Sequence, residues 1–63
     1  MSKVTPAERV ALEAVARLGS VKAAAYSLGK SPRTLDQQLA SARQRLGVDS
    51  TIQAVVREGI TPA

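Results

Sequence analysis

The residues that could do chemistry are concentrated in one stretch, 32–46, with the sequence PRTLDQQLASARQRL. At 100° per residue its apolar side chains fall within about 60° of arc, which predicts a buried stripe. These are Leu35, Leu39, Ala42 and Leu46. The opposite side holds Arg33, Gln37, Ala40, Ser41 and Gln44, flanked by Asp36 and Arg43. In a major groove arginine pairs with guanine, glutamine with adenine and aspartate with the cytosine amine. The pattern favours a helix that reads base edges, with a solvated polar face as the alternative.

The composition argues against catalysis and metal binding. The chain has 63 residues with no Cys and no His. Cys/His zinc sites, disulfides, a thiolate nucleophile and the usual general base are therefore excluded. A domain of this length also leaves little room for a cleft. We expect no enzyme activity, no catalytic residue, no metal and no cofactor.

The charge distribution predicts a polyanionic partner. The whole chain carries +4, yet residues 17–45 hold six cations and only Asp36 as an anion, a net +5, and the remaining residues carry −1. Concentrated basic charge is typical of nucleic-acid binding, although small domains can also be basic for solubility. The candidate phosphate-binding cations are Arg17, Lys22, Lys30, Arg33, Arg43 and Arg45. RNA is disfavoured because sequence-specific RNA modules stack bases on aromatic residues, and Tyr26 is the only one here.

Capping residues divide the chain into helices. Thr5-Pro6-Ala7-Glu8 and Ser31-Pro32 are typical helix starts, Ser20 and either Asp49 or Ser50 suit two more, and a glycine follows each predicted helix. We expect an all-α fold of four helices over 6–18, 21–28, 32–46 and 51–58, forming a single domain over 1–63. With no Phe or Trp the core must be aliphatic, and Tyr26 is expected to be a packing residue of the second helix, with its hydroxyl near a phosphate as the alternative. No long apolar run indicates a signal peptide or membrane span, so we expect a soluble, cytoplasmic protein.

The second and third helices have the spacing of a helix-turn-helix unit. Ala25, Gly29 and Leu35 stand at positions 0, +4 and +10. A small residue lets the two helices approach, a glycine adopts the left-handed conformation of the turn, and an apolar residue docks the following helix. With a capped start at each helix, this spacing predicts a helix-turn-helix fold.

The chain resembles the LuxR/GerE-type helix-turn-helix domain over almost its whole length. The similar stretches are TPAER (5–9), SLGKSPRTL (27–35) and RLGVDS (45–50), with Ala54-Val55 in the last helix. The middle, RLGSVKAAAYSLG (17–29), is also similar to the winged helix-turn-helix of LysR-type regulators. Nothing after Gly47 resembles a wing, so the first resemblance is preferred.

This resemblance implies that the third helix enters the major groove and that the fourth forms a dimer interface. It implies base contacts from the positions of Asp36, Gln37 and Ala40. It implies backbone contacts from those of Lys22, Ser31, Thr34 and Arg43. The chain departs from the LuxR/GerE pattern at Asp36, where Lys or Arg is usual, and at Ala24 and Lys30, where large aliphatic residues are usual. The lost burial, about 1.5–3 kcal/mol for each large side chain, predicts a weak monomer.

Together these features predict a sequence-specific double-stranded DNA-binding protein, a small transcriptional regulator that binds as a homodimer. Base reading is assigned to Arg33, Asp36, Gln37, Ala40 and Ser41. Phosphate contacts are assigned to Arg17, Lys22, Lys30, Ser31, Thr34, Arg43, Gln44 and Arg45. Within the fourth helix, Ala54 and Val55 are expected to face inward, leaving Ile52 and Val56 for the dimer contact, unless these two also pack internally. The alternative function is a protein-binding adaptor that contacts a host regulator or polymerase subunit instead of DNA.

Overall fold

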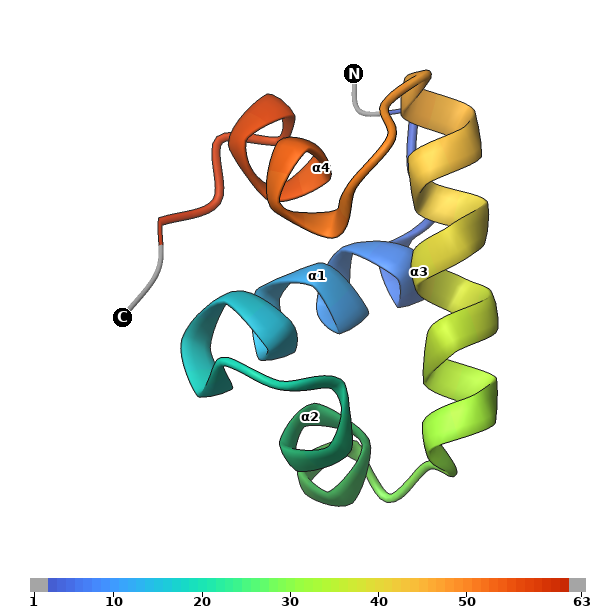
Figure 1. Cartoon of the computed structure of the whole chain (residues 1–63), viewed down its shortest axis with the longest axis vertical. Helices are drawn as coiled ribbons and strands as arrows, with labels where there is room; N and C mark the ends of the chain where they lie inside the picture. The colour runs from blue at the N-terminus through green and yellow to red at the C-terminus, as the bar shows by residue number, and fades with distance from the viewer. Residues whose placement is uncertain (1–2, 62–63) are drawn as a thin grey trace.

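A computed structural model describes residues 3–61 and contains four α-helices in this part of the chain. They are α1 (Pro6–Leu18), α2 (Val21–Leu28), α3 (Pro32–Leu46) and α4 (Thr51–Arg57). The predicted all-α fold is confirmed, and the fourth helix ends one residue earlier than expected. Helix α1 contacts the other three helices, whereas α2 and α4 lie on opposite sides of it (Figure 1). Helix α3 runs along one side of the molecule and crosses the end of α1, so its outer face is left open (Figure 1).

Local capping chemistry sets the helix ends. The hydroxyl of Thr5 accepts from the Glu8 N–H at 3.1 Å while Glu8 Oε1 accepts from the Thr5 N–H at 2.9 Å, which closes a capping box. The hydroxyls of Ser20, Ser31 and Ser50 each accept from the N–H three residues further on, and Gln53 completes a second capping box with Ser50. Ser50 rather than Asp49 is therefore the cap of α4. The turn between α2 and α3 is made by Gly29 at φ +67°, a left-handed conformation that costs a residue without Cβ little.

The core is aliphatic and built largely from small residues. The predicted stripe of α3 is buried, and Leu12, Leu35 and Leu39 are the largest side chains fully removed from solvent. Alanines fill the helix crossings because a methyl side chain lets two backbones approach closely. The buried alanines are Ala11, Ala14, Ala24, Ala25, Ala42 and Ala54.

Two large side chains, Tyr26 and Leu18, lie outside the core. Tyr26 is 88% exposed, so the expectation that it packs on α2 was wrong. Helix α2 turns Ala24 and Ala25 toward the core, and a residue one or two positions further along is rotated by 100–200° into solvent. Leu18, at the last position of α1, is also 42% exposed. The core is therefore smaller than the apolar pattern suggested.

Candidate nucleic-acid interface

The outer face of α3 consists of polar side chains directed away from the protein. Arg33, Asp36, Gln37, Ala40 and Gln44 are all exposed, because each lies opposite or beside the buried leucine stripe of the same helix. The predicted two-sided character of the helix is confirmed. An exposed arginine and glutamine on a straight helix of 15 residues form a surface that can enter a major groove.

The start of α3 presents two hydroxyls beside this face. Ser31 and Thr34 are both exposed, and Ser31 Oγ accepts from the Thr34 N–H at 3.1 Å and donates to Thr34 Oγ1 at 2.9 Å. The positive end of the helix dipole lies at the same place. This is a suitable position for phosphate contacts, which serine and threonine side chains often make.

The six candidate phosphate-binding cations fall into two groups. Arg17, Lys22 and Arg33 are exposed, and their side chains make no hydrogen bond or ion pair within residues 3–61. The other three have partners in the protein. Lys30 Nζ donates to Gln38 Oε1 at 3.2 Å, Arg43 Nη1 donates to Thr51 Oγ1 at 2.9 Å, and Arg45 pairs with Glu8. The first group is free to meet an anion without breaking an internal contact.

Glu8 is a functional candidate that the sequence reasoning missed. It is 5% exposed and lies between the start of α1 and the flank of α3. Arg45 Nε is 3.1 Å from both of its carboxylate oxygens. Burial raises the pKa of Glu8, but hydrogen bonds from the Thr5 N–H, Ser41 and Arg45, together with the charge of Arg45, outweigh it and hold the pKa below 4.5. The capping motif TPAE marked Glu8 as a cap, but no local pattern indicated its pairing with Arg45.

A shallow hollow of about 390 Å³ runs between the start of α1 and the outer face of α3. Thr5 and Ala7 line it from α1, and Thr34, Gln37 and Ser41 line it from α3. The first turn of α1 therefore borders the polar face of α3, and any molecule that covers Gln37 also approaches α1.

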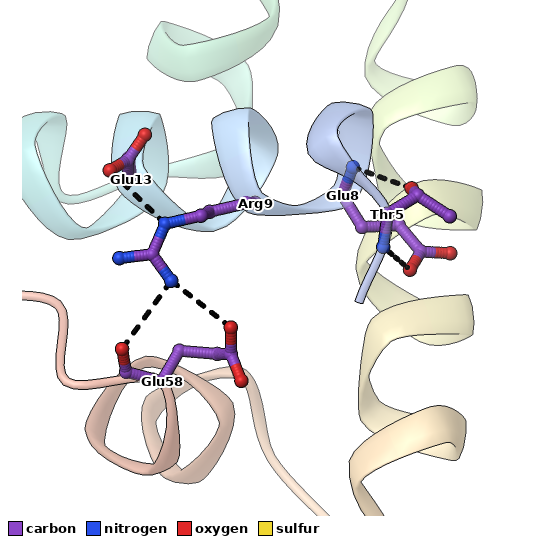
Figure 2. A network of polar contacts seen from close by, with 5 residues as sticks. All are labelled: Thr5, Glu8, Arg9, Glu13 and Glu58. Atoms are coloured by element: carbon purple, nitrogen blue, oxygen red, sulfur yellow. Dashed lines mark hydrogen bonds and ion pairs between the residues drawn. The ribbon is translucent and has the colours of Figure 1, made fainter. Parts of the chain in front are cut away.

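Polar contacts join α1 to Glu58, the residue that caps the end of α4. Arg9 Nη1 donates to Glu58 Oε1 at 3.0 Å and to the Glu58 carbonyl at 3.4 Å, and Arg9 Nε lies 3.7 Å from Glu13 Oε2 (Figure 2). These contacts fix which side of α4 faces the core.

Ala54 and Val55 are buried, as expected, whereas Ile52 is 76% and Val56 is 72% exposed. The alternative that Ile52 and Val56 pack internally is thus excluded. An apolar hollow flanks them on each side, one of about 390 Å³ toward α1 and one of about 300 Å³ toward Val48.

Residues 3–61 contain no group of three or more carboxylates close enough to hold a metal ion. Within the same residues no helix has the length and apolar character needed to cross a bilayer.

Comparison with known families identifies the helix-turn-helix. Residues 9–49 match the family described as bacterial regulatory helix-turn-helix protein, lysR family. The chain belongs to this family. It is therefore a DNA-binding transcription regulator of helix-turn-helix type, and the family is one of regulators rather than enzymes. No curated protein and no solved structure gives a significant match to the chain.

The LysR-type match covers α2 and α3 entirely and ends before α4 begins. It supports the second of the two resemblances, the one carried by residues 17–29, and the LuxR/GerE type is not confirmed. After Gly47 the described residues form α4, and no strand occurs among residues 3–61 that could make a wing. The matched segment thus contains the α2–α3 helix-turn-helix, and α4 lies outside it.

Proposed function

We propose that this chain binds double-stranded DNA in a sequence-specific manner, as a single domain and a small transcriptional regulator, with α3 in the major groove. The observation that carries the proposal is the outer face of α3, where Arg33 and Gln37 are exposed on the side opposite a fully buried leucine stripe. A helix needs this combination, a rigid support on one side and groups that match base edges on the other, to read a major groove. A regulator that binds the chromosome acts in the cytoplasm of a bacterial cell.

Four side chains are proposed to select bases. Arg33 offers a bidentate donor pair to guanine, and Gln37 offers a donor and an acceptor to adenine. Asp36 accepts from the cytosine amine, which explains an acidic group on a face that meets a polyanion. Ala40 contributes a methyl group that suits contact with thymine. Ser41 is set apart from these because it is half-buried beside Glu8.

Phosphate contacts are proposed for side chains around this face. Arg17 and Lys22 can bind phosphate without losing an internal partner. The exposed hydroxyl of Tyr26, one helical turn after Lys22, is a further donor. The remaining proposed contacts are Ser31, Thr34, Lys30, Arg43 and Gln44. If about five of them form in each protomer, the logarithm of the binding constant should fall with the logarithm of salt concentration at a slope near −4.5 per protomer.

We further propose that the chain binds as a homodimer through α4. Ile52 and Val56 form an exposed apolar ridge with an apolar hollow on each side. A ridge beside a groove is self-complementary across a two-fold axis, because each copy can insert its ridge into the groove of the other. Such a dimer would place two α3 helices about 34 Å apart, one turn of DNA, and would require an inverted repeat.

The test is selection of bound duplexes from random DNA, read by sequencing. We expect enrichment of an inverted repeat whose half-sites lie about 10 base pairs apart, centre to centre. Failure to enrich any duplex, even at low ionic strength, would refute the proposal. If a pull-down then returned one protein partner, the chain would be an adaptor that uses the same face for a protein.

A further inference from the structure

Glu8 is a charged residue that is only 5% exposed, and it lies against the helix proposed to read DNA. It belongs to the first turn of α1, where one of its oxygens completes the capping box. A buried carboxylate is costly unless it is paired and hydrogen-bonded. Glu8 meets this condition through residues of α3, which lie more than 30 positions away in the sequence.

Two α3 residues beside Glu8 lie at the border of the outer face. Arg45 Nε is 3.1 Å from both Glu8 oxygens, and the half-buried Ser41 lines the same hollow as Glu8. Ser41 and Arg45 are one turn apart, and Ser41 is itself one turn after Gln37, so the three form a row along α3. The contact with Glu8 therefore holds one end of a row whose other end, Gln37, points into solvent.

We propose that Glu8 is a positioning residue for DNA reading: its carboxylate holds Arg45 against α1, sets the rotation of α3 about its axis, and keeps Arg45 away from DNA phosphates. The inference rests on the proposed function. It removes Ser41 from the base-reading set and Arg45 from the phosphate-binding set. It leaves Arg33 and Gln37 as the strongest hydrogen-bonding side chains presented to the groove.

Removing the charge of Glu8 should have two consequences for binding. Arg45 loses its partner and becomes available to phosphate, so the salt dependence of binding becomes steeper by up to about one unit of slope. At the same time α3 loses a contact that fixes its rotation, so base recognition weakens. Binding to unrelated DNA is then retained or strengthened while discrimination falls.

The experiment measures affinity by fluorescence anisotropy for the selected duplex and for a scrambled duplex across a series of salt concentrations. The proteins are the wild type, Glu8→Gln, Arg45→Gln and the double variant, with Glu13→Gln as a matched control. Glutamine at position 8 keeps an oxygen that can accept from the Thr5 N–H. Glu13 lies on the same helix and is exposed, and its ion pair is with Arg9 rather than with α3.

We expect Glu8→Gln to steepen the slope by up to about one and to lower the ratio of specific to scrambled affinity about threefold or more. Arg45→Gln should leave the slope unchanged, since Arg45 contacts no phosphate in the wild type. The double variant should return to the wild-type slope because the freed arginine is absent. Glu13→Gln should match the wild type in both measurements.

Two results would overturn the inference. A slope shallower by about one in Arg45→Gln would show that Arg45 binds phosphate directly. A Glu8→Gln protein with the slope and discrimination of the wild type would show that Glu8 is only structural. If Glu8→Gln does not fold, Arg45→Gln still decides the matter, because its side chain is 50% exposed and its loss leaves the core intact. A wild-type chain that binds no duplex would instead refute the proposed function on which the inference depends.

Discussion

Single residues in this chain serve two purposes at once. Glu8 caps α1 with one contact and holds α3 with another. Lys30 and Arg43 are basic residues of the proposed interface, yet each donates a hydrogen bond to a neighbouring side chain. The charge that faces outward without a partner is smaller than the net charge of residues 17–45 suggests. Whether a basic side chain can bind DNA therefore depends on whether it already has a hydrogen-bond or ion-pair partner within the protein.

The lowered pKa of Glu8 makes stability depend on pH in a defined direction. Because the folded chain holds this pKa below its ordinary value of 4.5, the stabilisation is present above about pH 4.5 and is lost as the pH falls through the lowered pKa. The Tm of the wild type should therefore exceed that of Glu8→Gln at pH 7, and the gap should narrow as the pH falls below 4.5. Thermal melts followed by circular dichroism measure it, and a gap that stays constant with pH would contradict it.

Variants of a base-reading residue and of a phosphate-binding residue should have different effects on DNA binding. Gln37→Ala should change the preferred base at one position of each half-site, because the amide that pairs with adenine is lost. The cost for the preferred sequence should be about 1–3 kcal/mol. Lys22→Ala should weaken all duplexes alike and reduce the salt slope by about one. Repeating the duplex selection with both variants checks this, and an unchanged preference in Gln37→Ala would count against the assignment.

At the scale of elements, the glycine turns set the angle at which α3 is presented. Gly29 follows α2, and its N–H donates to the carbonyls of Ala25 and Tyr26 while its backbone adopts φ +67°. Space around the position is open, so a Cβ there would meet no neighbouring atom within 4 Å. The requirement for glycine at this turn comes from backbone conformation alone.

Gly29→Ala should therefore destabilise the fold by about 1–2 kcal/mol, the cost of a left-handed conformation for a residue with Cβ. For a domain of this size each kcal/mol should lower the Tm by about 4–8 °C. Gly29→Asn should lose less, because asparagine adopts this conformation more readily. Urea unfolding of the three proteins measures the difference, and an alanine variant as stable as the wild type would contradict the argument.

At the scale of the whole molecule, the described chain presents two faces of different chemistry. Helix α3 presents polar and basic groups, and α4 presents the apolar ridge of Ile52 and Val56. Helix α1 contacts both α3 and α4, and these two helices also contact each other (Figure 1). The small core buries few large side chains, so a second copy that covers the α4 ridge would add apolar burial at about 25 cal/mol per Å².

The dimer proposal predicts that the double variant Ile52→Glu, Val56→Glu folds normally but no longer forms a dimer. Both side chains are exposed, so helix content should be unchanged while sedimentation equilibrium changes from dimer to monomer. Affinity for the inverted repeat should fall, and affinity for a single half-site should be retained. Val10→Glu, at a 43% exposed apolar position on α1, is the control and should remain dimeric. A wild type that is monomeric at all concentrations tested would exclude the proposal.

The sequence by itself determined the helices, their caps, the turn glycines and the buried stripe of α3. These features depend on residues within about four positions of one another, and local backbone geometry is nearly independent of the rest of the chain. The polar composition of the α3 face, with Arg33 and Gln37, was predictable for the same reason.

Only the tertiary structure decided that Glu8 pairs with Arg45, that Tyr26 is exposed, and that Ile52 and Val56 point outward instead of packing internally. Glu8 and Arg45 are separated by 37 positions and meet because α1 crosses α3 at a particular place. That crossing is set by how the alanines of several helices fit together, a packing result that no local spacing encodes.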